Sequence, residues 1–186
     1  MRKVVVMVAF IACCMVAACS YKINITPLSV NSQIIFSINP NFSMGNFTYL
    51  PARNGFVKLN EIKNHGNDYI YLSENIDDLC KKITQEGLIS SNAVIKKQSE
   101  FAISGDIVEL TMNSWGFNGV SFLYTVIYKI ANANGDEVYM NSFNKIKTGV
   151  HLWSMSKLSE VVQEMMLDAY NELARDIEEK NIFDRE

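Results

Sequence analysis

The side chains in this sequence that could take part in covalent or metal chemistry are few, because the chain has 4 cysteines and 2 histidines. The most unusual setting is that of Cys19, which follows Val16-Ala17-Ala18 and comes directly before the polar Ser20. A cysteine in a protein core does not need small residues before it and a polar residue after it. The pattern is typical of a processing site, where a peptidase must hold extended backbone.

The residues before Cys19 have the layout of a secretory signal. The chain opens with the basic pair Arg2-Lys3, and no charged residue follows from Val4 to Ala18. A positive start, a short apolar stretch and small residues before the cut define such a signal. The alternative is an uncleaved membrane helix, which needs about 20 apolar residues. The shorter stretch observed here favours the signal.

Val16-Ala17-Ala18-Cys19 resembles the bacterial lipobox, in which a branched apolar residue and two small residues precede a cysteine. The resemblance implies that Cys19 receives a diacylglycerol through a thioether, that cleavage occurs before it, and that its new amine is acylated. Several acyl chains on one residue hold a soluble domain firmly at a membrane. Ser20 after the cysteine implies an outer-membrane location facing the periplasm in a bacterium with two membranes. Cys13 and Cys14 fit the motif poorly.

This reading divides the chain into a signal peptide, residues 1–18, a lipidated tether, residues 19–33, and a single periplasmic α+β domain, residues 34–186. The net charge of the whole chain is −3, and removal of the basic signal makes the rest more acidic. An acidic domain has no electrostatic footprint for nucleic acid. We therefore expect no nucleic-acid partner, and expect the membrane to be contacted through the acyl chains.

Two stretches have the apolar period of amphipathic helices. The first is capped by Asn75, carries Asp77 and Asp78 in a first turn where the helix dipole favours anions, and is expected to end at Gly87. The second runs from about Lys157 to Glu179 and has a wide apolar face. Both faces are wide enough to pack on a protein core.

Three consecutive stretches between these helices have the character of strands: Phe101–Met112, Val120–Ile130 and Asp136–Lys147. Asn134-Gly135 between the last two is a strong hairpin signal, and Gly105-Asp106 in the first suggests a bulge. We therefore predict an α+β fold with an antiparallel sheet. Its order is strands, helix, three-strand meander, helix, with the helices packed on one side.

No arrangement of residues for catalysis or metal binding is found in the sequence. His65 and His151 are far apart, and no HExxH, CxxC or G-x-S-x-G motif is present. Cys80 lies on the apolar face of the first predicted helix and is expected to be a buried, inert thiol. We predict a protein that is not an enzyme and that carries no cofactor and no metal.

Aromatic residues stand where polar turns are expected. Trp115 and Phe117 lie between two predicted strands, and Trp153 comes just before the last helix. One alternative is that these rings fold back onto the core. The other is that Trp115, Phe117 and Trp153 form an exposed interaction patch, since aromatic residues are enriched at interface hot spots.

The stretches "FTYLPARNGFVKLNEI" and "IYLSENIDDLCKKITQEGL", a strand carrying "ISGDI" and a long last helix resemble small YajG-like bacterial lipoproteins. The layout is also similar to auxiliary lipoproteins of lipid-trafficking ABC systems. We predict a non-enzymatic, membrane-anchored module that binds another envelope component, an envelope protein of unknown identity. The alternative is a lipid-transport accessory that shelters acyl chains in an apolar groove between the sheet and the last helix, under Met165 and Met166.

Overall fold

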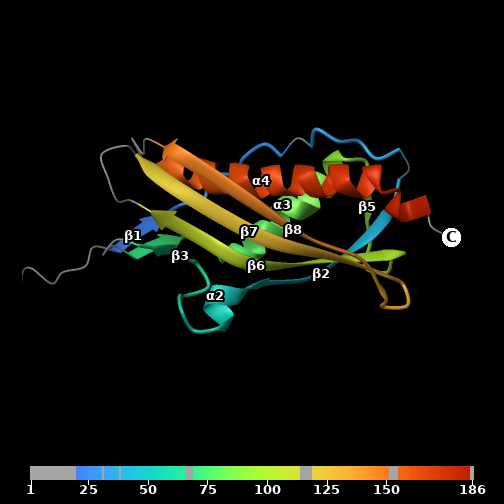
Figure 1. The fold of residues 1–186 in the computed structure, drawn as a ribbon, viewed down its shortest axis with the longest axis horizontal. Coiled ribbons are helices and arrows are strands. Elements are labelled where there is room, and N and C mark those ends of the chain that lie inside the picture. The colour runs from blue at the N-terminus through green and yellow to red at the C-terminus, as the bar shows by residue number, and fades with distance from the viewer. Residues whose placement is uncertain are drawn as a thin grey trace, which may run out of the picture.

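The computed structural model describes residues 20–30, 32–37, 39–65, 69–113, 119–150 and 155–184 (Figure 1). The elements within these residues are, in chain order, β1 (Ser20–Ile23), β2 (Asn41–Tyr49), α2 (Leu50–Arg53), β3 (Glu61–Asn64), β4 (Tyr69–Leu72), α3 (Ile76–Ser90), β5 (Val94–Ile95), β6 (Phe101–Asn113), β7 (Val120–Asn132), β8 (Glu137–Val150), α4 (Met155–Glu179) and a 3-10 turn, η1 (Ile182–Asp184). None of the helices in the described ranges is both long and apolar enough to cross a membrane.

The predicted meander forms one side of the sheet and ends at β8, which pairs only with β7 among the described strands, and the sheet as a whole is mixed rather than antiparallel. Strands β6, β7 and β8 pair antiparallel in sequence order. Along its other edge, β6 pairs in parallel with two strands. Strand β2 pairs with the first part of β6 and β3 pairs with its last part, and α2 lies between β2 and β3 in the chain. Because the chain passes from β2 to β6 through α3, the two strands run in the same direction, as in other helix crossovers. The bulge in β6 lies between Ile107 and Glu109, two residues beyond the predicted position.

Helices α3 and α4 pack on one face of the sheet, which confirms the predicted α+β fold (Figure 1). Every second residue of β7 from Phe122 to Ile130 is buried. Two of these are tyrosines whose hydroxyl groups reach α3. Tyr124 lies 3.1 Å from the Cys80 sulfur, and Tyr128 lies 3.1 Å from the Thr84 hydroxyl. Strand alternation therefore directs one row of side chains into a core shared with both helices.

Helix α3 begins after Asn75 as predicted, but it continues past Gly87 to Ser90. Gly87 lies inside the helix, where a Cβ atom would stand 2.6 Å from ring atoms of Tyr170. The glycine therefore serves the close approach of α3 to α4 rather than helix termination. The left-handed residue that follows the helix is Asn92, with φ 73°.

The segment expected to form a tether is packed along α4 in its described part. Backbone amides of Thr26, Leu28 and Gln33 donate to the side chains of Ser159, Gln163 and Asn171 in turn. These three α4 side chains are buried polar groups, which need hydrogen-bond partners away from water. We call residues 25–30 and 32–37 the strap, because these segments follow α4 along its length.

The molecule is elongated, and its two ends differ (Figure 1). The β1 end comprises β1 and its parallel neighbour β4, and the loop after α2 lies beside this end, toward the middle of the molecule. The hairpin end comprises the β7–β8 hairpin, the start of β6 and η1. The strap and α4 run between them.

Candidate binding pocket at the hairpin end

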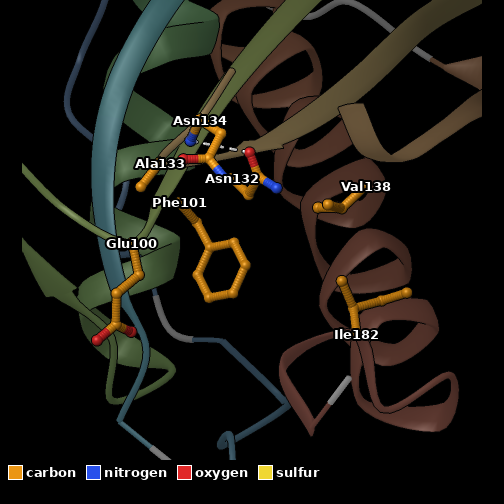
Figure 2. A pocket seen from close by; sticks show the side chains of 7 residues that line it. All are labelled: Glu100, Phe101, Asn132, Ala133, Asn134, Val138 and Ile182. Atoms are coloured by element: carbon orange, nitrogen blue, oxygen red, sulfur yellow. Dashed lines mark hydrogen bonds between the residues drawn. The ribbon is translucent and has the colours of Figure 1, made fainter. Parts of the chain in front are cut away.

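A pocket of about 440 Å³ opens at the hairpin end of the molecule (Figure 2). It lies between the start of β6, the β7–β8 hairpin and η1, elements that are far apart in the sequence. Its described lining consists of Glu100, Phe101, Asn132, Ala133, Asn134, Val138 and Ile182. A shallower hollow of about 330 Å³ shares Glu100 and Ala133 with it. The fold thus creates one recessed surface from three separate parts of the chain.

The floor of the pocket is aromatic and rests on the core. The Phe101 ring lies between Glu100 on one side and Val138 and Ile182 on the other (Figure 2). Its ring centre is 5.1 Å from that of Phe183 and 5.9 Å from that of a second ring, Phe42, which is completely buried. Such contacts between rings favour a fixed geometry. The floor is therefore a rigid apolar surface.

The strap contributes to this floor from the opposite end of the chain. Phe36 is buried and meets Phe183 edge-on, with ring centres 5.6 Å apart. The backbone amide of Phe36 donates to the carbonyl of Ser91, just beyond α3. The N-terminal segment therefore helps to hold η1, and with it Ile182, beside the pocket.

The rim of the pocket is polar and is fixed by the hairpin turn. The side-chain oxygen of Asn132 accepts hydrogen bonds from the backbone amides of Asn134 and Asp136, each at 3.0 Å. Gly135 takes the left-handed conformation, with φ +89°, so the hairpin predicted from Asn134-Gly135 is confirmed, although residues 133–136 rather than two residues separate β7 from β8. Because the turn satisfies its own amides, the rim keeps its shape without a ligand. A rigid apolar floor with a polar rim is typical of small binding sites.

The sequence offered one usable signal for this pocket, and it was missed. Ile182 and Phe183 form an apolar pair after the charged end of the last helix. Such a pair needs a surface to cover, and the start of β6 provides it.

The site residues predicted from the sequence, Cys19, Trp115, Phe117 and Trp153, lie outside the described residues. The described strand ends closest to them in sequence lie at the β1 end (Figure 1). There, Val120 pairs with Val150, and β6 ends beside β3. The interaction patch and the lipidation of Cys19 therefore remain predictions.

The groove predicted under Met165 and Met166 is not open at that position. Both side chains are completely buried within the continuous hydrophobic core. Packed side chains therefore occupy the interface between α4 and the sheet at the place where acyl chains were expected. This finding argues against the predicted groove as a lipid site.

Cys80 is buried, as its place on the apolar face of α3 predicted. Burial raises the pKa of its thiol to about 11, although hydrogen bonding to Tyr124 opposes the shift. A thiol with this pKa is protonated at neutral pH and is a poor nucleophile. Across the described parts of the chain, no group of three His, Cys, Asp or Glu residues is arranged to hold a metal ion.

No family model matches the sequence, and no curated protein matches it either. The resemblance to YajG-like lipoproteins therefore stays a prediction.

Solved structures do match. The protein XCC0632 from Xanthomonas campestris, described as a DUF330 family protein, is similar with TM-score 0.65 and 8% identity, over 88% of this chain and 98% of that chain. The hypothetical protein CT253 from Chlamydia trachomatis is similar with TM-score 0.53 and 12% identity, over 76% and 96%. A minor lipoprotein from Acinetobacter baumannii gives TM-score 0.43 and 12% identity, over 76% and 94%. The first two similarities show a shared fold, and the third carries no further argument.

Proposed function

We propose that this chain is a lipid-anchored protein of the bacterial envelope whose body binds another envelope component through the pocket at the hairpin end. The observation that carries the proposal is the preformed pocket at the hairpin end, whose lining elements lie at the end of the molecule opposite β1 (Figure 1). The predicted acyl chains sit on Cys19, directly before the first residue of β1. A body anchored there presents its hairpin end away from the membrane.

The pocket chemistry favours a protein partner that inserts an apolar side chain. Its volume is near the lower end of the range for small-ligand sites, about 300–1,000 Å³. Phe101, Val138 and Ile182 provide an apolar floor and wall, and the exposed carboxylate of Glu100 stands at the rim. An apolar residue flanked by a lysine or arginine would satisfy both parts of the surface.

The same chemistry supports binding rather than catalysis. Among the described lining residues, Glu100 is the one acidic or basic side chain, and it is exposed. General acid–base catalysis uses side chains positioned within hydrogen-bond reach of the reacting atoms. The apolar floor and wall formed by Phe101, Val138 and Ile182 instead suit an apolar contact.

Site-specific photocrosslinking tests the proposal. A photoreactive amino acid replaces Val138, which is 38% exposed and lines the pocket, in the full-length protein in its native envelope. The matched control replaces Ile146, which is 67% exposed on the same strand and is not among the described lining residues. We expect a discrete protein adduct from position 138 and none from position 146.

Three other outcomes would each count against the proposal. An adduct of lipid mass at position 138 would support the lipid-handling alternative with the pocket as its site. An adduct at position 146 alone would move the contact to the outer face of the sheet. The absence of an adduct at both positions would leave the pocket without a partner.

A charge substitution tests the same contact without the photoreactive amino acid. Val138→Lys places an ammonium group over the apolar floor and should abolish co-purification of the partner that the crosslink at position 138 identifies. Ile146→Lys should leave recovery unchanged. Because both positions are exposed, the free energy of unfolding of each variant should lie within about 0.5 kcal/mol of that of the parent protein.

A further inference from the structure

The β1 end carries exposed aromatic side chains. Tyr21 is 40% exposed and Tyr69 is 49% exposed. Tyr69 stacks on Tyr71 with ring centres 6.4 Å apart and an angle of 9° between the ring planes. The Lys58 ammonium group lies 4.9 Å from the centre of the Tyr71 ring. An amphipathic ring beside a cation is a combination suited to a membrane–water interface.

The loop that carries Lys58 adds apolar surface beside this end. Phe56 is 76% exposed and Leu59 is 48% exposed. Large apolar side chains on a surface are ordinary when they are single. Here they accompany three tyrosines, on a loop tied to β4 through the contact of Lys58 with Tyr71. The loop therefore adjoins the exposed rings of β4 at Lys58, whereas Phe56 lines a hollow with Val108 and Leu110 of β6.

The chain leaves almost no distance between this surface and the predicted acyl chains. Strand β1 begins at Ser20 and pairs in parallel with β4, Ser20 beside Tyr69 and Tyr21 beside Ile70. One extended residue spans about 3.5 Å. A lipid on residue 19 therefore fixes the first residues of β1, and the start of β4 beside them, within a few ångströms of the headgroups.

We infer that the β1 end rests directly on the bilayer, with Tyr21, Tyr69 and Tyr71 at the level of the lipid headgroups. The inference rests on the proposed acylation of Cys19 and adds an orientation to it. The packed strap removes the freedom that a tether would give. The body stands on its β1 end, and the pocket is held at a fixed height above the membrane.

Accessibility of a spin label tests this orientation. The full-length lipidated protein is reconstituted in vesicles of phosphatidylethanolamine and phosphatidylglycerol. A nitroxide is placed at Tyr69→Cys, at Lys22→Cys on the exposed part of β1, and at Val138→Cys at the hairpin end as the control. The native Cys80 thiol is buried and should not react under native conditions. Circular dichroism confirms that each variant is folded.

We expect the ratio of relaxation by oxygen to relaxation by a water-soluble nickel chelate to be higher for labels at positions 69 and 22 than for the label at position 138. The label at position 138 should show the low ratio of a site in bulk water. Equal nickel access at positions 69 and 138, with acyl mass present on Cys19, would overturn the orientation while leaving the anchor intact. A label at 69 protected from both reagents would indicate a protein contact and would also overturn it. Absence of acyl mass on Cys19 would instead defeat the proposed anchor.

Discussion

The two ends of this molecule use aromatic side chains in opposite ways. At the hairpin end, Phe42 is completely buried and Phe36 nearly so, and both support the floor of the pocket. At the β1 end, Tyr21 and Tyr69 expose 40% and 49% of their surface. Burial therefore separates rings that hold the fold together from rings that remain available for contact.

The connection between the ends explains how both can act in one protein. Helix α4 has 25 residues, which at 1.5 Å per residue gives a rod of about 37 Å. The strap is hydrogen-bonded to this helix from Ser159, near the start of α4, to Glu178, near the end of α4. A rod with a bonded strap keeps the two ends at a fixed separation, so a membrane contact at one end sets the position of the pocket at the other.

The largest effect should come from the attachment point itself. Cys19→Ala removes the sulfur on which the thioether forms, so acyl mass should be lost completely and the body should lose its membrane anchor. Intact-mass measurement and membrane fractionation check both results. Val138→Lys is the matched control and should keep its acyl mass. A parent protein that starts at another residue and carries no acyl mass would refute the anchor.

Replacing one aromatic side chain at each end of the molecule by alanine should distinguish rings that stabilise the fold from rings that are available for contact. Phe42→Ala should reduce the free energy of unfolding by about 3–5 kcal/mol, because it empties space in the packed floor. Tyr69→Ala should change it by about 0.5 kcal/mol, since the ring is exposed and stacks with one neighbour. Urea unfolding monitored by circular dichroism measures both. Similar losses for the two variants would erase the distinction between the ends.

The centre of the molecule, between the two ends, should respond to alkaline pH. Burial raises the pKa of the Cys80 thiol from about 9 to about 11. The folded state therefore holds the proton more tightly, and its contribution to stability is complete below about pH 9 and is lost as the pH rises toward 11. The total loss should be about 2–3 kcal/mol.

Comparison with Cys80→Ala isolates this effect from the neighbouring tyrosines, whose pKa values burial also raises. Urea unfolding at several pH values should show a steeper decline for the parent protein than for the variant between pH 9 and 11. Parallel curves would mean that the thiol does not titrate in the buried environment described here.

The parts of the fold with repeated local patterns could be predicted from the sequence. The alternation of Phe122, Tyr124 and Val126 placed β7 in the meander, and the helical period placed α4 within two residues of its observed start. The parallel pairing of β2 and β3 with β6 could not be derived in this way. This pairing depends on where β6 joins the sheet after the crossover through α3, and no short stretch of sequence determines that position.

The strap and the pocket show a second reason for failure. Residues 19–33 are polar, which suggested a tether, but the decisive signal lies on α4. Ser159, Gln163 and Asn171 follow one another at spacings of four and eight residues on a buried face, and they require partners from another segment. The pocket brings together Phe101, Val138 and Ile182, each of which alone is an ordinary strand or turn residue. Only the folded chain combines them.

The smallest expected effect on stability concerns the aromatic patch predicted between β6 and β7. Trp115→Ala combined with Phe117→Ala should shift the free energy of unfolding by no more than about 0.5 kcal/mol if these rings are exposed contact residues. A buried ring would instead cost about 3–5 kcal/mol. The strands that flank these residues end at the β1 end (Figure 1). The same double variant should therefore leave the adduct at position 138 unchanged while weakening any contact made beside the membrane. If the double variant lost the adduct at position 138 while its stability stayed unchanged, both ends would bind one partner. The assignment of membrane contact to the β1 end and partner binding to the hairpin end would then be wrong.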